Sequence, residues 1–175
     1  MAAILSLIIV IVDQIAKFII TRCADKLPVD ILNGIFSINL VYNKGGAFGI
    51  LQHQNYLFIL ISSIAILIIL LILPRQEINT IKIALSFIMG GAIGNMIDRV
   101  RLGCVIDFLD FKIWPVFNIA DSAITIGAVL LVLQLLKSKV SASTTQKRNS
   151  WRIRRSAMRK GGKNQKYKLK VKSCL

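Results

Sequence analysis

The sequence predicts an α-helical integral membrane protein with four transmembrane helices. Of its 175 residues, 55% are hydrophobic, and the mean hydropathy is +0.66, which is too apolar for an ordinary soluble domain. The apolar residues gather into four segments, each long enough to cross a bilayer, which takes about 20 helical residues. We expect the spans at about residues 2–21, 56–73, 81–97 and 117–136.

The charged residues divide the chain into two parts. Residues 1–136 contain nine Lys/Arg and eight Asp/Glu, whereas residues 137–175 contain fourteen Lys/Arg and no acid. We therefore expect a membrane-embedded domain over residues 1–139 and a disordered, basic tail over residues 140–175. Each Lys or Arg close to an anionic lipid surface contributes about 1 kcal/mol of attraction, so we expect membrane lipids, rather than nucleic acid, to bind the tail.

The first span, residues 2–21, contains two opposite charges. Asp13 and Lys17 are four residues apart, so they share one face of a helix and can pair. Because a charge in lipid is costly, this face is expected to contact other helices. A neutralised structural pair and a direct functional role both fit this expectation. No Lys or Arg precedes the apolar run, which argues against a cleaved signal peptide.

The region between the first two spans, residues 22–55, has a different pattern. Residues 35–43, IFSINLVYN, are rich in β-formers and predict a short strand. Residues 43–49, NKGGAFG, form a glycine-rich turn that matches no phosphate-binding pattern. This turn favours a close approach of the backbone to a ligand or to another segment. The second span, residues 56–73, carries no charge and is expected to be scaffold.

The third span, residues 81–97, is rich in glycine, which predicts close packing against another helix. Packing does not explain the polar residues at its end, Asn95, Asp98 and Arg99. An ionisable side chain in a membrane segment is a candidate functional residue by default.

Residues 103–116 precede the fourth span and are expected to be a loop or a short amphipathic surface helix. The basis is the spacing of three between its aromatic residues, Phe108, Phe111 and Trp114. The fourth span then begins with Asn118, a candidate N-cap, and Asp121 in the first turn, where the helix N-terminus favours an acid.

Positively charged segments stay on the cytoplasmic side of a membrane. The basic tail therefore places the C-terminus inside, and four spans place the N-terminus inside as well. This topology brings the unusual polar residues to the outer face. They are Asp13, Lys17, Asn43, Asn95, Asp98, Arg99, Asp107, Asn118 and Asp121.

Several acids at one face predict proton-transfer chemistry. Two carboxylates that share one proton can activate a water molecule and polarise a peptide carbonyl. Asp121 is the first choice because a helix holds it, and spacing leaves Asp107 and Asp110 as equal candidates for its partner. A hydrolase that pairs Ser122 with Lys17 is the main catalytic rival, although no sequence spacing supports this pair.

Two functions other than catalysis remain open. One is a small ion or proton carrier that uses Asp13, Asp98 and Arg99. The other is a non-enzymatic membrane adaptor that acts through the basic tail. No metal or other cofactor is expected, because the single His and the three Cys have no metal-ligand spacing. Whether Cys23 and Cys104 pair is left open.

Five sequence blocks, in order, resemble the bacterial signal peptidase II family, the lipoprotein signal peptidases. The blocks are DQIAK (13–17), NKGGAFG (43–49), GGAIGNMIDR (90–99), VIDFLDF (105–111) and FNIADSAI (117–124). The resemblance covers roughly residues 10–136, and the basic tail lies outside it.

The resemblance implies a membrane aspartyl endopeptidase of the bacterial cytoplasmic membrane, without a cofactor, whose active site faces outward. Such an enzyme removes the signal peptide of a prolipoprotein just before a cysteine that carries diacylglycerol. It also implies a small outer β-sheet in residues 22–55, between the first two helices.

By motif position, the resemblance implies that Asp107 and Asp121 are catalytic and that Asp110 is not. Other residues on motif positions are implied to support this pair or to contact substrate. They are Asp13, Lys17, Asn43, Gly49, Asn95, Asp98, Arg99, Asn118 and Ala120.

Overall fold

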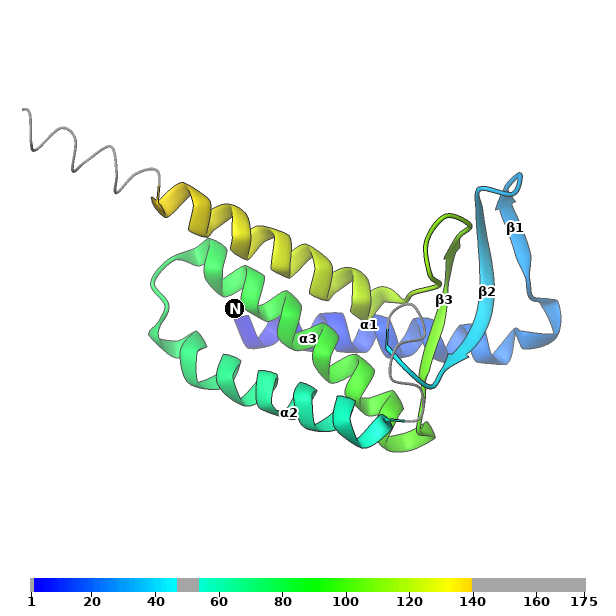
Figure 1. The fold of residues 1–175 in the computed structure, drawn as a ribbon, viewed down its shortest axis with the longest axis horizontal. Helices are drawn as coiled ribbons and strands as arrows, with labels where there is room; N and C mark the ends of the chain where they lie inside the picture. The colour runs from blue at the N-terminus through cyan, green and yellow to red at the C-terminus, as the bar shows by residue number, and fades with distance from the viewer. Residues whose placement is uncertain (1, 47–53, 140–175) are drawn as a thin grey trace, which may run out of the picture. The chain divides into compact units, whose positions relative to one another are not determined.

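A computed structural model describes residues 2–46 and 54–139 of the chain (Figure 1). Contacts within the chain divide it into two units, residues 1–132 and 133–175. The predicted disorder of residues 140–175 lies outside the described residues and stays a prediction. The described cysteines, Cys23 and Cys104, are both free.

Four helices are long and apolar enough to cross a membrane, as the sequence predicts. They are α1 (Ala2–Arg22), α2 (Asn55–Ile72, continued by the 3₁₀ turn η3, Leu73–Arg75), α3 (Asn79–Leu102) and the fourth helix (Ile119–Lys139). Another 3₁₀ turn, η1 (Ala24–Lys26), follows α1.

Helix α3 lies at the centre of the packing. Half of its apolar segment is buried, against 6% for that of α2. Its glycines explain this, because a Cβ at Gly91 would collide with the carbonyl oxygen of Ala120 on the fourth helix. A Cβ at Gly94 would lie 2.7 Å from Oδ2 of Asp13 on α1. The glycine-rich face therefore packs closely against two helices, as predicted.

Helix α3 ends five residues later than the sequence predicts. It continues to Leu102 and stops at Gly103, which has a φ of 75° and caps the helix in the left-handed conformation. Asp98 and Arg99 therefore lie within the helix instead of just beyond it.

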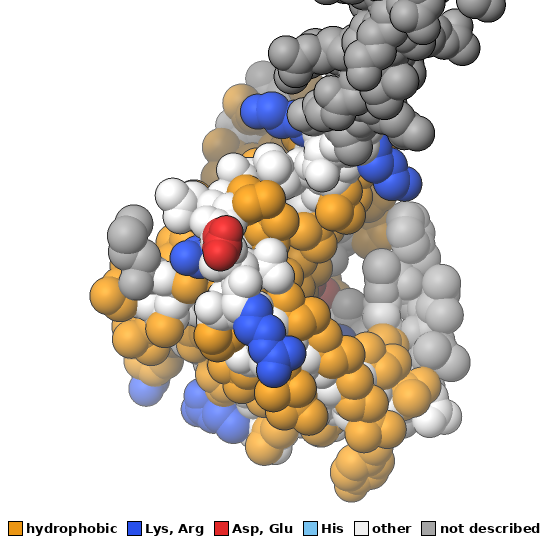
Figure 2. Space-filling model, turned by 90° about the vertical axis from the view of Figure 1, so that its left-hand side faces the viewer, with side chains coloured by type: hydrophobic (Ala, Val, Ile, Leu, Met, Phe, Trp, Pro, Cys, Tyr) orange, Lys and Arg blue, Asp and Glu red, His pale blue; other side chains and the backbone are white. Residues whose placement is uncertain are grey.

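The outward faces of the helices carry large exposed apolar side chains, such as Ile4 on α1, Leu67 on α2 and Val129 on the fourth helix. The end of the helices opposite the sheet carries Lys, Arg and acidic side chains among hydrophobic ones (Figure 2). Lipid is the solvent that fits the apolar outward faces, because a helix pairs its backbone polar groups internally.

A three-stranded antiparallel sheet lies at one end of the helices (Figure 1). Its strands, in spatial order, are β1 (Val29–Leu32), β2 (Phe36–Asn43) and β3 (Val105–Phe111). Asn33 and Gly34, both with positive φ, form the turn between β1 and β2. The sequence predicts β2 correctly.

The expectation of a loop or surface helix before the fourth span is wrong, because Val105–Phe111 is strand β3. It pairs with β2 from Asn43↔Val105 to Phe36↔Phe111. A spacing of three between aromatic residues suits a helix, but β2 supplies hydrogen-bond partners for an extended backbone. Phe108 is only 4% exposed in this strand. The sheet thus takes its third strand from the segment that links α3 to the fourth helix.

Candidate active site

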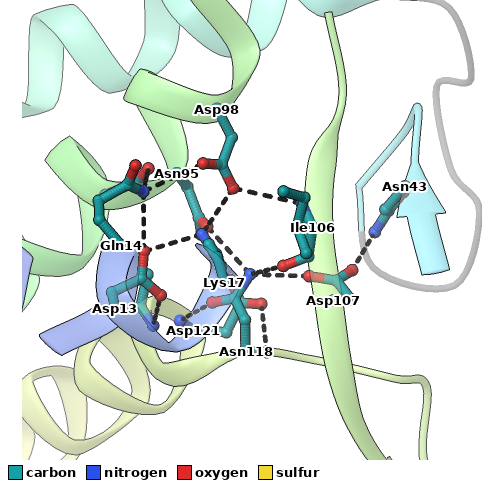
Figure 3. A network of polar contacts seen from close by, with 12 residues as sticks. Asp13, Gln14, Lys17, Asn43, Asn95, Asp98, Ile106, Asp107, Asn118 and Asp121 are labelled. Carbon is teal, nitrogen blue, oxygen red and sulfur yellow. Dashed lines mark hydrogen bonds and ion pairs between the residues drawn. The ribbon is translucent and has the colours of Figure 1, made fainter. Parts of the chain in front are cut away.

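Asp13 and Lys17 of α1 pair with each other and face α3. Lys17 Nζ lies 2.8 Å from Asp13 Oδ2 and 2.7 Å from Asp98 Oδ2 (Figure 3). Lys17 is 2% exposed and Asp13 is 0% exposed. The prediction that this pair contacts other helices is therefore confirmed. Burial without such partners would be strongly unfavourable for a charged group.

An amide connects this ion cluster to the fourth helix. Asn95 Oδ1 accepts a hydrogen bond from Lys17 Nζ at 3.0 Å, and Asn95 Nδ2 donates to Asp121 Oδ1 at 2.7 Å. Asp121 therefore has a fixed donor on one of its carboxylate oxygens.

The start of the fourth helix is a reciprocal cap. Asn118 Oδ1 accepts from the Asp121 backbone N–H at 2.8 Å, and Asp121 Oδ2 accepts from the Asn118 backbone N–H at 3.2 Å. This is the geometry of a capping box, with an Asn and an Asp in place of the commoner residue pairs. The predicted N-cap role of Asn118 is confirmed.

The same Asn118 reaches the second aspartate. Its Nδ2 donates to Asp107 Oδ1 on β3 at 2.7 Å, while Asn43 Nδ2 on β2 donates to Asp107 Oδ2 at 2.9 Å (Figure 3). Asn118, which is fully buried, thus bridges Asp107 and Asp121. Asn118 thereby links strand β3 to the start of the fourth helix.

Burial raises the pKa of Asp107 to about 6. This value already includes the hydrogen bonds from Asn43 and Asn118, which lower the pKa, and the negative charge of Asp121, which raises it. A carboxyl with such a pKa holds or releases a proton near neutral pH, which is the property required of a general acid or base.

Both aspartates open onto one cavity of about 730 Å³. Its polar lining also includes Asn43, Asn95 and Arg99. Arg99 also lies 4.7 Å from the centre of the Phe58 ring of α2, in a cation–π contact. The apolar part of the cavity lining includes Trp114, Pro115, Val116, Phe117 and Ile124. The cavity can therefore hold an extended, partly apolar ligand against two carboxyl groups.

Comparisons with known proteins show the family of this chain. Residues 5–137 match the family model described as signal peptidase (SPase) II. The chain belongs to the signal peptidase II family. The family resemblance and the fold class stated from the sequence are both confirmed, and the protein is a peptidase of this family.

Sequence matches to lipoprotein signal peptidases extend over most of the chain. The lipoprotein signal peptidase of Halothermothrix orenii is 41% identical over 139 residues, which are 77% of this chain and 94% of the relative. That of Caldicellulosiruptor bescii is 42% identical over 127 residues, 73% of this chain and 85% of the relative. A solved structure described as a bacterial membrane enzyme is similar with a TM-score of 0.74, at 32% identity, over 79% of this chain and 88% of its own.

The structure brings together nearly all residues implied by the signal peptidase II motifs. The cluster and its cavity include Asp13, Lys17, Asn43, Asn95, Asp98, Arg99, Asp107, Asn118 and Asp121. Ala120 contributes its backbone N–H, which donates to Asp13 Oδ1 at 2.9 Å. Gly49 lies outside the described residues.

Asp110 does not join this cluster. Side chains alternate between the two faces of a strand, so Asp107 and Asp110, three residues apart, point to opposite faces of β3. Asp110 instead pairs with Lys112 at 2.6 Å and accepts from the Ser37 hydroxyl. The rival pair of Ser122 and Lys17 also gains no support, because the Ser122 hydroxyl donates to the Asn118 carbonyl.

Sequence reasoning did not identify Gln14 as a site residue. Its Nε2 lies 3.0 Å from Asp98 Oδ1 and 3.2 Å from the Gly94 carbonyl oxygen. The available signal was a polar side chain next to Asp13 in an otherwise apolar run. Among the described residues, no group of three or more His, Cys, Asp and Glu side chains could hold a metal ion.

Proposed function

We propose that the protein is an aspartyl endopeptidase that removes signal peptides from diacylglyceryl-modified prolipoproteins, just before the lipidated cysteine. The observation that carries the proposal is the pair Asp107 and Asp121, bridged by Asn118 at the wall of one cavity. The relatives named lipoprotein signal peptidases support the substrate class.

In the proposed mechanism, the two carboxyl groups share one proton and hold a water molecule between them. Each carboxylate accepts two N–H donors, from Asn95 and the Asn118 backbone at Asp121 and from Asn43 and the Asn118 amide at Asp107, and the proposed mechanism starts with Asp121 ionised. Asp107 is the protonated partner, consistent with its pKa of about 6.

Asp121 takes a proton from the water, whose oxygen bonds to the peptide carbonyl carbon, while Asp107 gives its proton to the carbonyl oxygen. The resulting tetrahedral intermediate is neutral. Asp121 then returns its proton to the leaving nitrogen, the C–N bond breaks, and Asp107 recovers a proton from a hydroxyl of the intermediate. The dyad thus ends the cycle with one shared proton.

The proposed orientation has the sheet and the dyad at the outer face of the bacterial inner membrane and both termini in the cytoplasm. The fourteen Lys/Arg of residues 137–175 support this orientation. The same charges support contact between the tail and anionic lipid on the cytoplasmic side.

An ion or proton carrier is less well supported, because the polar cluster does not continue toward the other end of the helices. Helix α2 and residues 122–136 of the fourth helix contain no Asp, Glu, Lys, Arg or His. A proton path would need such groups on both sides of Asp98.

The proposed reaction is tested with purified protein and a synthetic prolipoprotein peptide, with and without diacylglycerol on its cysteine. We expect cleavage of the modified peptide and not of the unmodified one. Mass spectrometry of the products should place the cut just before this cysteine. A variant truncated after residue 140 should cleave at a similar rate. Absence of cleavage by the full chain, or a cut elsewhere, would contradict the proposal. Cleavage that required the tail would favour the adaptor function.

The variant Asn43→Ala should change the pH dependence of this cleavage. The Asn43 N–H stabilises the ionised form of Asp107 and lowers its pKa, so its removal raises that pKa above about 6. The dyad loses its shared proton at high pH. A higher pKa of Asp107 should therefore move the alkaline limb of the kcat profile to higher pH.

The measurement is kcat as a function of pH for wild type and Asn43→Ala. As a control, Asn39→Ala removes a neighbouring amide of β2 that does not contact Asp107 and should leave the profile in place. A shift of the alkaline limb to lower pH in Asn43→Ala would contradict the roles assigned to Asn43 and Asp107.

A further inference from the structure

We propose that Lys17 is a positioning residue that sets the orientation of two amide side chains, and thereby supplies both catalytic aspartates with N–H donors. The inference rests on the proposed function of Asp107 and Asp121. Lys17 does not line the cavity, so it acts through the residues between it and the dyad.

The argument starts from the hydrogen-bonding capacity of an ammonium group, which has three donors and no acceptor. Lys17 Nζ directs them to Asp13 Oδ2, Asp98 Oδ2 and Asn95 Oδ1, at 2.8, 2.7 and 3.0 Å. The atom of Asn95 that faces Lys17 must therefore be the oxygen. Because the amide is planar, its nitrogen points the other way, toward Asp121 Oδ1 at 2.7 Å.

The orientation of the second amide follows from the first. Asn118 Nδ2 lies 3.0 Å from the same oxygen of Asn95, and only a donor is favourable there. This nitrogen also donates to Asp107 Oδ1 at 2.7 Å. The other end of the Asn118 amide, its oxygen, accepts from the Asp121 backbone N–H. One cation thus determines the polarity of hydrogen bonds that end on both carboxylates.

The cluster around Lys17 is built to hold this cation in place. Asp13 Oδ1 accepts from the Ala120 backbone N–H, and Asp98 accepts from the Ile106 backbone N–H and from Gln14 Nε2. Both carboxylates are thereby fixed, and no described side chain in the cluster lacks a partner. This network explains why Asp13 and Asp98 are buried beside the dyad although only Asp107 and Asp121 take part in the proposed reaction.

The test must separate orientation from charge balance. Lys17→Met alone leaves Asp13 and Asp98 without a counter-charge and could unfold the protein. The double variant Lys17→Met/Asp98→Asn removes one charge of each sign and keeps the net charge. Its matched control is Asp98→Asn, which keeps Lys17 and its bond to Asn95. Lys17→Arg, also a pure donor, is the conservative variant.

The assay is cleavage of the diacylglyceryl-modified peptide, with kcat and KM determined across pH, beside thermal unfolding in detergent. We expect kcat of the double variant to be about 10 to 100 times lower than that of Asp98→Asn, as for loss of a hydrogen bond to a charged group. KM should change much less, because Lys17 does not line the cavity. The alkaline limb should move to higher pH, since the Lys17 charge lowers the pKa of Asp107. Lys17→Arg should retain more activity than the double variant.

A folded double variant whose kcat lies within twofold of that of Asp98→Asn would overturn the proposal. If the double variant does not fold, Asn95→Asp tests the next link, because it keeps an oxygen toward Lys17 and puts a carboxylate oxygen in place of the donor toward Asp121. A kcat of Asn95→Asp equal to that of wild type would also overturn the proposal. Activity in Asp107→Asn or Asp121→Asn would instead contradict the proposed function itself.

Discussion

Replacement of Asp121 or Asp107 by Asn should lower kcat for cleavage of the modified peptide by about a thousandfold or more. An Asn at either position cannot exchange a proton with water or substrate, and one proton-transfer group contributes about 10²- to 10⁴-fold. The two losses should not add in the double variant, because either carboxyl alone is unable to complete the cycle.

The control for these variants is Asp110→Asn, on the opposite face of β3. Asp110 contacts Ser37 and Lys112 and not the dyad, so kcat should fall by no more than a few-fold. Thermal unfolding should show that all variants are folded. Wild-type rates in Asp107→Asn or Asp121→Asn, or a loss in Asp110→Asn as large as theirs, would contradict the assignment.

The variant Asn118→Ala should have the second largest effect, because it removes the bridge between the two aspartates. It deletes the N–H donor to Asp107 Oδ1 and the acceptor for the Asp121 backbone N–H. We expect kcat to fall by about 100-fold, as for a lost charge-assisted hydrogen bond. Loss of the N-cap should also lower the free energy of unfolding by about 1 kcal/mol.

The variant Asn118→Ser separates these two effects. Its hydroxyl can cap the helix but is too short to replace the amide donor to Asp107, so stability should recover while kcat stays low. Unfolding midpoints and kcat, measured on the same preparations, give both quantities. If kcat recovers together with stability, Asn118 acts only as a cap and the bridging role is wrong.

The four helices could be predicted from sequence because their signal is local. A run of about 20 apolar residues spans a bilayer whatever surrounds it, and glycines permit close packing wherever they fall on a helix. The pairing of Asp13 with Lys17 is local in the same sense, since a spacing of four places both on one helix face. The motif order then indicated the family.

Strand β3 could not be predicted in the same way. Residues 105–111 are an apolar run that suits a strand, a loop or a surface helix, and periodicity alone does not separate these for so short a segment. The partner that decides the matter is β2, more than sixty residues earlier in the chain. The position of Asp107 beside Asn118, with Asp110 on the far face, depends on that pairing.

The sequence by itself thus determined a four-helix membrane protein with costly acids, because burial and span length are properties of each segment. It also identified, by resemblance, which acids to consider. Only the tertiary structure decided how they meet. A shared cavity, the bridge through Asn118 and the amide orientation imposed by Lys17 join residues from α1, α3, β3 and the fourth helix. Hydrogen-bond polarity across four elements arises only when these elements pack together.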